Sequence, residues 1–148
     1  MSAPNVLLPT NEIDEDMRLG IRLLAKLARI AEQACQATGI SLPQYRLLAE
    51  VAGSPSRASA LATRLAVSRP TLTSLVDGLE TAGLLQRVPV PTDRRGIELR
   101  ATDAGIAAVA RAEAVLAERM MGLAGRTQRA DVTGITRYMS SVLAQSAA

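Results

Sequence analysis

The chain has 148 residues, of which 48% are hydrophobic and 1% aromatic, and its formal net charge is +3. This length and composition suit a single domain, 1–148, with an aliphatic core packed between helices. The sequence contains no run of 18 apolar residues and no signal-peptide pattern, so we expect a cytoplasmic protein with no membrane partner. One Cys excludes an intrachain disulfide.

The charges are unevenly distributed along the chain. Residues 57–100 contain seven Arg and four acidic residues, whereas residues 1–16 contain four acidic residues and no basic one. All 17 basic residues except Lys26 are Arg, whose guanidinium makes forked contacts with guanine and phosphate that an ammonium cannot make. A net charge of +3 does not by itself indicate nucleic-acid binding, but the distribution of charge makes 57–100 the candidate segment for it.

The first predicted element is a long helix from about Ile13 to Thr38, followed by Gly39 as a plausible residue after the helix end. Its apolar surface is wide for a terminal helix of a small domain. The helix could be well buried in the core of one chain or covered by a second subunit, and the width favours the second interpretation.

Two short helices and a tight turn are expected next. Ser41 is placed to cap a helix over Leu42–Ala52, and a third helix spans about Arg57–Ala66. The turn Ala66-Val67-Ser68 leads into a fourth helix that ends near Gly83. Two short helices joined by three residues are the arrangement that a helix-turn-helix requires.

The fourth helix has one apolar stripe and an unusual polar face. Its N-terminal half contains small hydroxyls and one Arg, whereas its carboxylates, Asp77 and Glu80, lie in the C-terminal half. A helix that meets DNA by its N-terminal end would keep those carboxylates away from phosphate and offer the positive end of its dipole. We therefore interpret it as a recognition helix for the major groove. The alternative is a capped helix with a solvated polar face. The residues assigned to DNA here are Ser68, Arg69, Pro70, Thr71, Thr73 and Ser74.

After Gly83 the pattern predicts a β-hairpin and then two more helices. Strands are expected at Leu84–Val88 and around 97–100, with a turn-rich loop Pro89–Gly96 between them. Thr102 is placed to cap a helix over about Asp103–Leu123, and a last helix covers about 128–145. The resulting fold class is mainly α with a small β-hairpin wing. A winged helix-turn-helix region, 41–101, is flanked by expected dimerisation helices in 12–39 and 103–146.

The chain resembles the MarR family of winged-helix transcription regulators. The resemblance rests on Leu-Ala-x-Arg-Leu at 61–65, Ser-Arg-Pro-Thr at 68–71, Leu-Val-Asp-x-Leu-Glu at 75–80, Gly-Leu-Leu-x-Arg at 83–87, Asp-Arg-Arg at 93–95 and Leu-x-x-Thr-x-x-Gly at 99–105. It implies a homodimer that binds pseudo-palindromic double-stranded DNA and is often released by a small molecule or an oxidant.

The resemblance also assigns roles in the wing. It implies that Arg95 enters the minor groove and that Arg94 contacts phosphate. Asp93 is expected to pair with Arg87 or Arg95 and to structure the wing. The alternative for the wing residues is an exposed charged turn.

The sequence departs from the family pattern at two places. Arg57, also assigned to DNA, stands where the family usually has a Ser or Thr cap, which leaves Ser56 as the other candidate cap. Pro89 and Pro91 stiffen the base of the wing, so its reach can differ from that of the family.

Two residues raise the question of regulation. Cys35 stands among apolar residues in a chain without His, so an inert core thiol is favoured over a redox sensor. Tyr45 is a candidate lining residue of an effector pocket between the first two helices, although a buried core Tyr is favoured.

The sequence thus predicts a homodimeric, DNA-binding transcription regulator, with repression favoured over activation. The alternative is a winged-helix module for protein–protein contact. An enzyme has little support, because no catalytic residues, metal ligands or phosphate-binding glycine loop are recognisable, and no cofactor is expected.

Overall fold

The computed structural model describes residues 13–90 and 93–124, together with Gly134 and Arg137. Residues 13–124 form, in chain order, α1 (Glu15–Gln36), α2 (Leu42–Gly53), β1 (Ser56–Arg57), α3 (Ala58–Leu65), α4 (Arg69–Thr81), β2 (Leu85–Val90), β3 (Asp93–Ala101) and α5 (Asp103–Ala124). The mainly helical fold with a small wing is confirmed. The helix expected at 128–145 lies outside the described residues.

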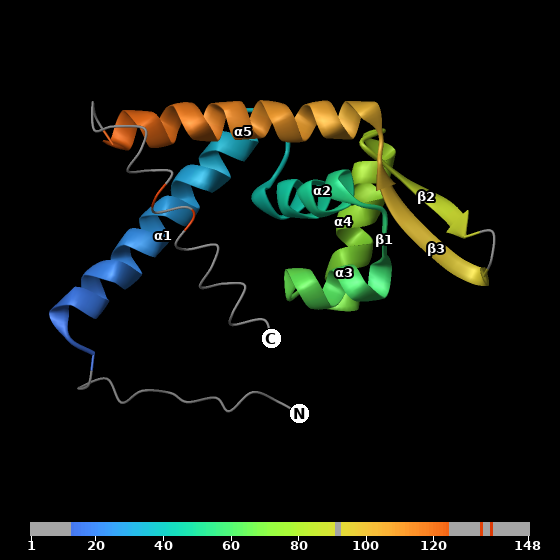
Figure 1. Cartoon of the computed structure of the whole chain (residues 1–148), viewed down its shortest axis with the longest axis horizontal. Coiled ribbons are helices and arrows are strands. Elements are labelled where there is room, and N and C mark those ends of the chain that lie inside the picture. Colours follow the sequence, from blue (N-terminus) through green and yellow to red (C-terminus); the bar gives the residue numbers. More distant parts are fainter. Residues whose placement is uncertain (1–12, 91–92, 125–133, 135–136, 138–148) are drawn as a thin grey trace.

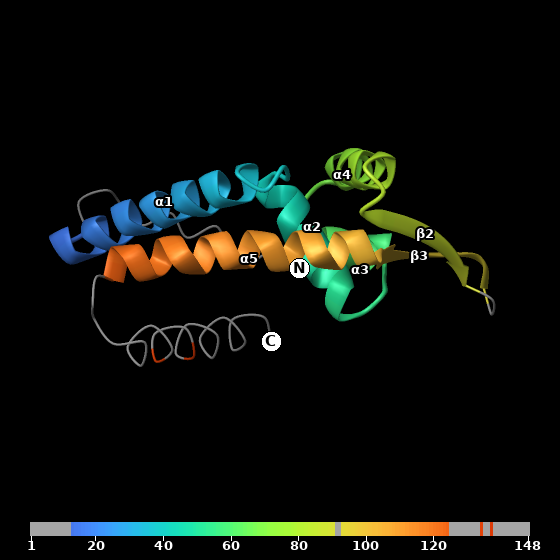
Figure 2. The same cartoon turned by 90° about the horizontal axis from the view of Figure 1, so that it is seen from above.

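The molecule has a compact part and an extended part. Helices α2, α3 and α4 gather beside the sheet, and α5 starts at the end of β3, passes along α2 and extends beyond it to contact the long helix α1 (Figure 1). The view from above shows α1 and α5 side by side, with the wing, the hairpin β2–β3, projecting at the opposite end (Figure 2). None of the described helices is both long enough and apolar enough to cross a membrane.

The helices begin where the sequence offers a capping side chain. Asp14 Oδ1 accepts a bond of 2.7 Å from the N–H of Met17 at the start of α1. Ser41 and Gln44 form a reciprocal capping box at the start of α2. Ser68 Oγ accepts from the N–H of Thr71 at the start of α4. Such caps satisfy backbone donors that have no partner within the helix, which confirms the predicted starts of α2 and α4.

The turn between α3 and α4 closes through a left-handed residue. Ala66 has φ 53° and ψ 44°, and its N–H donates to the carbonyl of Thr63. The N–H of Val67 donates to the carbonyl of Ala62, which ties the chain back to the last turn of α3. The short turn predicted at Ala66–Ser68 is therefore confirmed.

The start of the third helix differs from the prediction. Arg57 is not a helical residue but lies in β1, where Ser56 pairs with Leu99 and Arg57 pairs with Glu98 of β3. The sheet therefore has three strands in the order β1-β3-β2 instead of the two of a simple hairpin. Local periodicity missed β1 because its backbone partners are more than 40 residues away in the sequence. Arg57 precedes α3 and makes no side-chain capping bond, and Ser56 does not take that role.

The strands of the wing run further than predicted. Proline has no N–H for a ladder, but Pro89 is accommodated in β2 because β2 is an edge strand. The register pairs Leu85 with Ala101 and Pro89 with Ile97, and then shifts so that Val90 pairs with Asp93. The expected loop 89–96 is thus replaced by a longer hairpin whose β3 strand carries the irregularity.

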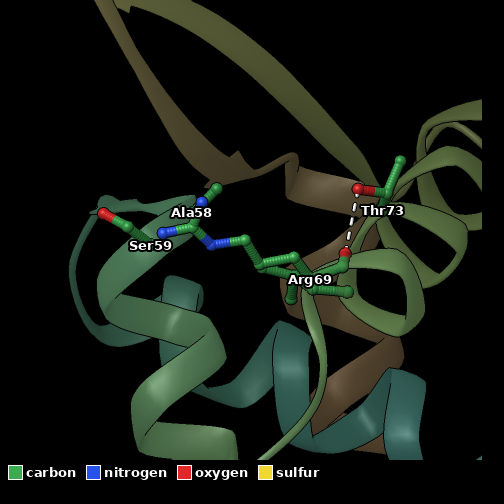
Figure 3. Close-up of a pocket in the computed structure, with 5 residues that line it drawn as sticks. Ala58, Ser59, Arg69 and Thr73 are labelled. Carbon is green, nitrogen blue, oxygen red and sulfur yellow. Dashed lines mark hydrogen bonds between the residues drawn. The ribbon is translucent and has the colours of Figure 1, made fainter.

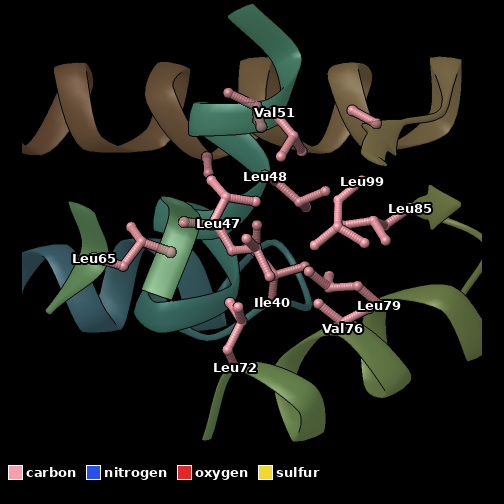
Figure 4. Close-up of a cluster of buried hydrophobic side chains, with 14 of the residues drawn as sticks. Ile40, Leu47, Leu48, Val51, Leu65, Leu72, Val76, Leu79, Leu85 and Leu99 are labelled. Carbon is pink, nitrogen blue, oxygen red and sulfur yellow. The ribbon is translucent and has the colours of Figure 1, made fainter. Parts of the chain in front are cut away.

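The core lies where α2, α3, α4, α5 and the sheet meet. Leu47, Leu61 and Leu79 are fully buried there, and Leu85 and Leu99 fix the root of the wing to the same cluster (Figure 4). Only the C-terminal end of α1 joins it, through Cys35. The core-helix interpretation of α1 is therefore wrong for its first half, because the large apolar residues from Met17 to Leu27 are exposed.

Candidate nucleic-acid interface

The N-terminal half of α4 faces outward. Leu72, Val76 and Leu79 are buried in the core, so the opposite face of the helix is directed toward solvent. The exposed residues on this side are the predicted ones: Ser68, Arg69, Pro70, Thr71, Thr73 and Ser74. The first turn contains no acidic residue, so the positive end of the helix dipole is not neutralised there. This surface can accept an anion such as a phosphate.

Some of these hydroxyls already have partners in the protein. Ser68 Oγ lies 2.7 Å from Thr71 Oγ1, in addition to capping the helix. Thr73 Oγ1 donates to the carbonyl of Arg69 at 3.0 Å. A hydroxyl that donates within its own helix retains lone pairs, so it can still accept a bond from a base amino group.

A cavity of about 290 Å³ separates the first turn of α4 from the first turn of α3. Ala58 and Ser59 line it from α3, and Arg69, Leu72 and Thr73 line it from α4. Figure 3 shows the Arg69 side chain extending across this space toward Ala58 and Ser59. Arg57 is exposed at the adjoining start of α3. Two helix starts and one guanidinium thus face a common opening.

Both carboxylates of α4 are bonded to one arginine of the wing. Arg87 of β2 donates through Nη2 to Asp77 Oδ1 at 2.6 Å and through Nη1 to Glu80 Oε2. The hydrogen bond to Asp77 is the main cause that raises the pKa of Arg87, so the guanidinium stays charged. Arg87 thus lies beside α4 and bonds both of its carboxylates. The side chain of Asp93 lies outside the described residues, so its expected pairing with Arg87 or Arg95 stays a prediction.

The arginines at the tip of the wing are placed only by their backbone. Asp93, Arg94 and Arg95 begin β3, within the shift of register that follows the pairing of Pro89 with Ile97. Their side chains lie outside the described part of the structure. Their assignment to the minor groove and to phosphate stays a prediction.

Cys35 and Tyr45 lie near the junction of α1, α2 and α5. Cys35 is a free thiol with 1% of its surface exposed, and burial, followed by the charge of Glu32, raises its pKa. Tyr45 is half-buried and its hydroxyl donates to Glu113 Oε1 at 3.2 Å. Burial raises the pKa of Tyr45, and the charge of Glu113 adds to the effect. A buried Cys is confirmed, whereas Tyr45 is more open than a core residue.

Sequence reasoning missed three partners in these sites. Glu113 lies 68 residues from Tyr45, and no local pattern connects them. The acidic pair of α4 was noted only as a hindrance to DNA, although Asp77 and Glu80 are three residues apart on a helix and thus share a face. An Arg shortly after the glycine turn could have suggested their partner. No group of three or more His, Cys, Asp or Glu suited to a metal occurs among the described residues.

Helices α3 and α4, the tight turn between them and the hairpin beyond define a winged helix-turn-helix protein. The sequence profile of the MarR family matches residues 38–96, which include α3, the turn, α4, β2 and the first part of β3. The chain belongs to the MarR family.

Two curated relatives are 30% identical to the chain. One is a candidate transcriptional regulatory protein for the hcr operon of Thauera aromatica, aligned over 109 residues, which are 73% of this chain and 66% of that protein. The other is the HTH-type transcriptional regulator PecS of Dickeya dadantii strain 3937, aligned over 111 residues, with 68% of this chain and 65% of PecS covered. The chain spans slightly less than two thirds of the length of each relative.

Solved structures share the fold at lower identity. The ligand-free wild-type MarR from E. coli superposes with a TM-score of 0.72 at 21% identity, covering 94% of this chain and 99% of MarR. NadR in complex with 4-hydroxyphenylacetate superposes with a TM-score of 0.69 at 21% identity, covering 91% of this chain and 97% of NadR.

Proposed function

We propose that the protein is a transcriptional regulator that binds specific sequences of double-stranded DNA as a homodimer. The observation that carries the proposal is the exposed N-terminal half of α4, which offers one Arg, several hydroxyls and a positive dipole end with no acidic residue in its first turn. The two relatives named as transcriptional regulators support the same function. A cytoplasmic location is part of the same proposal.

In this proposal α4 enters the major groove with its N-terminal end first. The guanidinium of Arg69 would bond O6 and N7 of a guanine, and the hydroxyls of Ser74 and Thr71 would contact phosphate or base edges. Pro70 would contact a thymine methyl group or stiffen the first turn. Arg95 would enter a narrow minor groove at A·T pairs, while Arg94 and Arg57 would bond phosphate.

The homodimer is supported by the apolar surface of α1. Its exposed large residues are Met17, Leu19, Ile21, Leu23, Leu24 and Leu27, and Ile106 and Met121 of α5 are exposed as well. Leu19 and Leu24 each have 62% of their surface exposed, an arrangement that costs free energy unless another surface covers it. A second copy would cover it and would present two recognition helices to a pseudo-palindromic operator. A dimer seated on an operator would block transcription, so we propose repression.

A small-molecule effector that releases the DNA is a further part of the proposal. NadR, which has the same fold, was solved with 4-hydroxyphenylacetate bound. In this chain Tyr45 offers a phenol near the junction of α1, α2 and α5, but its bond to Glu113 would have to open for a ligand to use it. A panel of small phenols and carboxylates, screened for release of bound DNA, tests this part. Release that persists in Tyr45→Phe would contradict the placement at Tyr45.

Selection of bound duplexes from a random pool tests the main proposal. We expect a palindromic sequence whose half-sites are spaced by about one helical turn, because the two recognition helices must meet successive major grooves. Affinity should fall steeply as salt is added, since about six or more phosphate contacts per dimer would release their counterions. Arg69→Ala should weaken binding to the selected sequence more than to the unselected pool.

One observation favours the second candidate, a winged-helix module for protein–protein contact. Ile97 on the wing has 51% of its surface exposed, and an apolar side chain at that place suits a protein partner better than a phosphate backbone. The absence of any affinity for duplex DNA at low salt would favour this candidate and exclude the first.

A further inference from the structure

One guanidinium connects the wing with the recognition helix. Asp77 and Glu80 lie three residues apart on α4, and Arg87 of β2 bonds one oxygen of each through separate nitrogens. The chain turns between the two elements at Gly83, which has φ 70°. Arg87 therefore connects the last part of α4 with β2, the edge strand of the sheet, across the loop that contains Gly83.

The bridge lies beyond the part of the wing that the core holds. Leu85 is buried in the core, whereas the side chains that follow it on β2 are half-buried or exposed. The Arg87 side chain itself is 33% exposed, and both carboxylates are more exposed than that. Exposed ion pairs contribute little to the stability of a fold, so a role in global stability is not expected from these contacts.

The same three groups set the charge on this side of α4. Asp77 and Glu80 alone would place two negative charges on α4, the proposed recognition helix. With the bonded Arg87 the net charge of the three groups is −1. At about 0.1 M salt the screening length is about 10 Å, so these carboxylates, on the third and fourth turns of α4, influence only phosphates that lie beside that part of the helix. A forked Arg can bond both carboxylates at once, which a Lys cannot do with the same geometry.

We propose that Arg87 is a positioning residue for DNA binding that acts through Asp77 and Glu80 and does not itself contact phosphate. Through these two bonds it holds the wing at a fixed angle to α4. The inference rests on the proposed DNA-binding function. It reverses the simplest expectation for an Arg in a wing, which is direct contact with the phosphate backbone.

A double-mutant cycle distinguishes the two roles. The variants are Arg87→Gln, the pair Asp77→Asn with Glu80→Gln, and the combination of all three, with affinity measured for the selected duplex. If Arg87 acts through the carboxylates, Arg87→Gln weakens binding about tenfold in the wild-type background and less than about twofold in the background without the carboxylates. An equal loss in both backgrounds, or no loss in either, would overturn the proposal.

Arg100→Gln is the matched control, because Arg100 is an exposed arginine of the same hairpin, paired in register with Gln86. Its effect should be independent of the two carboxylates. The urea midpoint of every variant should stay at the wild-type value, which separates positioning from a loss of the fold.

Amide hydrogen exchange of β2 gives a second arm that needs no DNA. Arg87→Gln should speed exchange beyond Leu85 by about threefold or more, and it should add nothing once both carboxylates are replaced. If the wild-type chain binds no duplex, the proposed function fails, and this arm still decides whether Arg87 positions the wing. Unchanged exchange in Arg87→Gln together with additive losses of affinity would assign Arg87 to direct contact with DNA.

Discussion

Replacement of Gly105 by Ala tests how α5 is seated on the root of the wing. A Cβ at this position would lie 2.0 Å from the carbonyl oxygen of Leu84 and 3.3 Å from Leu48 Cδ2. Ordinary contact begins near 3.4 Å, so the start of α5 and the backbone of Leu84 would have to separate by about 1.4 Å. Leu84 cannot yield freely, because its carbonyl accepts from the N–H of Thr102 at 3.1 Å and its N–H donates to Leu79.

The magnitude follows from these two effects. Overpacking a well-packed site raises the free energy of the folded state by about 1–3 kcal/mol, and loss of the backbone bond from Thr102 adds about 1 kcal/mol. We therefore expect Gly105→Ala to lower the free energy of unfolding by about 2–4 kcal/mol. For a chain of this length that corresponds to a fall in Tm of about 5–15 °C.

Urea unfolding at one fixed protein concentration measures the effect. Gly78→Ala is the matched control, because its added Cβ would meet only Gln44 Nε2 at 3.6 Å, within the interior of α4. Ala has the higher helix propensity, so this control should be as stable as the wild type or more stable by up to about 1 kcal/mol. A Gly105→Ala protein with wild-type stability would refute the packing argument.

Three further predictions concern the interface, the assembly and the thiol. Arg95→Ala should lower operator affinity by about 1–3 kcal/mol at fixed salt, and unchanged binding in a shift assay would refute the assignment of the wing tip to the minor groove. Leu24→Asp should halve the mass measured by light scattering, whereas Arg22→Ala on the same helix should leave it unchanged; a monomeric wild type would contradict the dimer. Cys35 should label slowly with a thiol reagent in the native protein and rapidly in urea, and fast native labelling would contradict its burial. Burial raises the pKa of Cys35 above its ordinary value of 9.0, so the folded state favours the neutral thiol. The stability that this provides is present below pH 9.0 and is lost as pH rises through the higher pKa of the folded state. Cys35→Ala should therefore reduce the fall in the free energy of unfolding above about pH 9.

The sequence by itself determined the starts and caps of α2 and α4, because these depend on neighbours within four residues. Ser41 and Ser68 cap the helices that follow them, Ser68 as predicted by its spacing from Pro70, and the turn at Ala66 joins α3 to α4 where the pattern places it. The sequence also determined which side of α4 is polar, since a buried stripe of helical period leaves the opposite side exposed.

Only the tertiary structure decided which distant groups meet. The strand β1 exists because Ser56 and Arg57 find backbone partners at Leu99 and Glu98. The local preference of two residues is too weak to predict such a strand. The turn at Gly83 brings Arg87 to α4, where its guanidinium bonds two carboxylates that lie seven and ten residues before it in the sequence. Long-range pairing depends on the path of the whole chain, and that path is fixed by the burial of the core and not by the residues that the pairing joins.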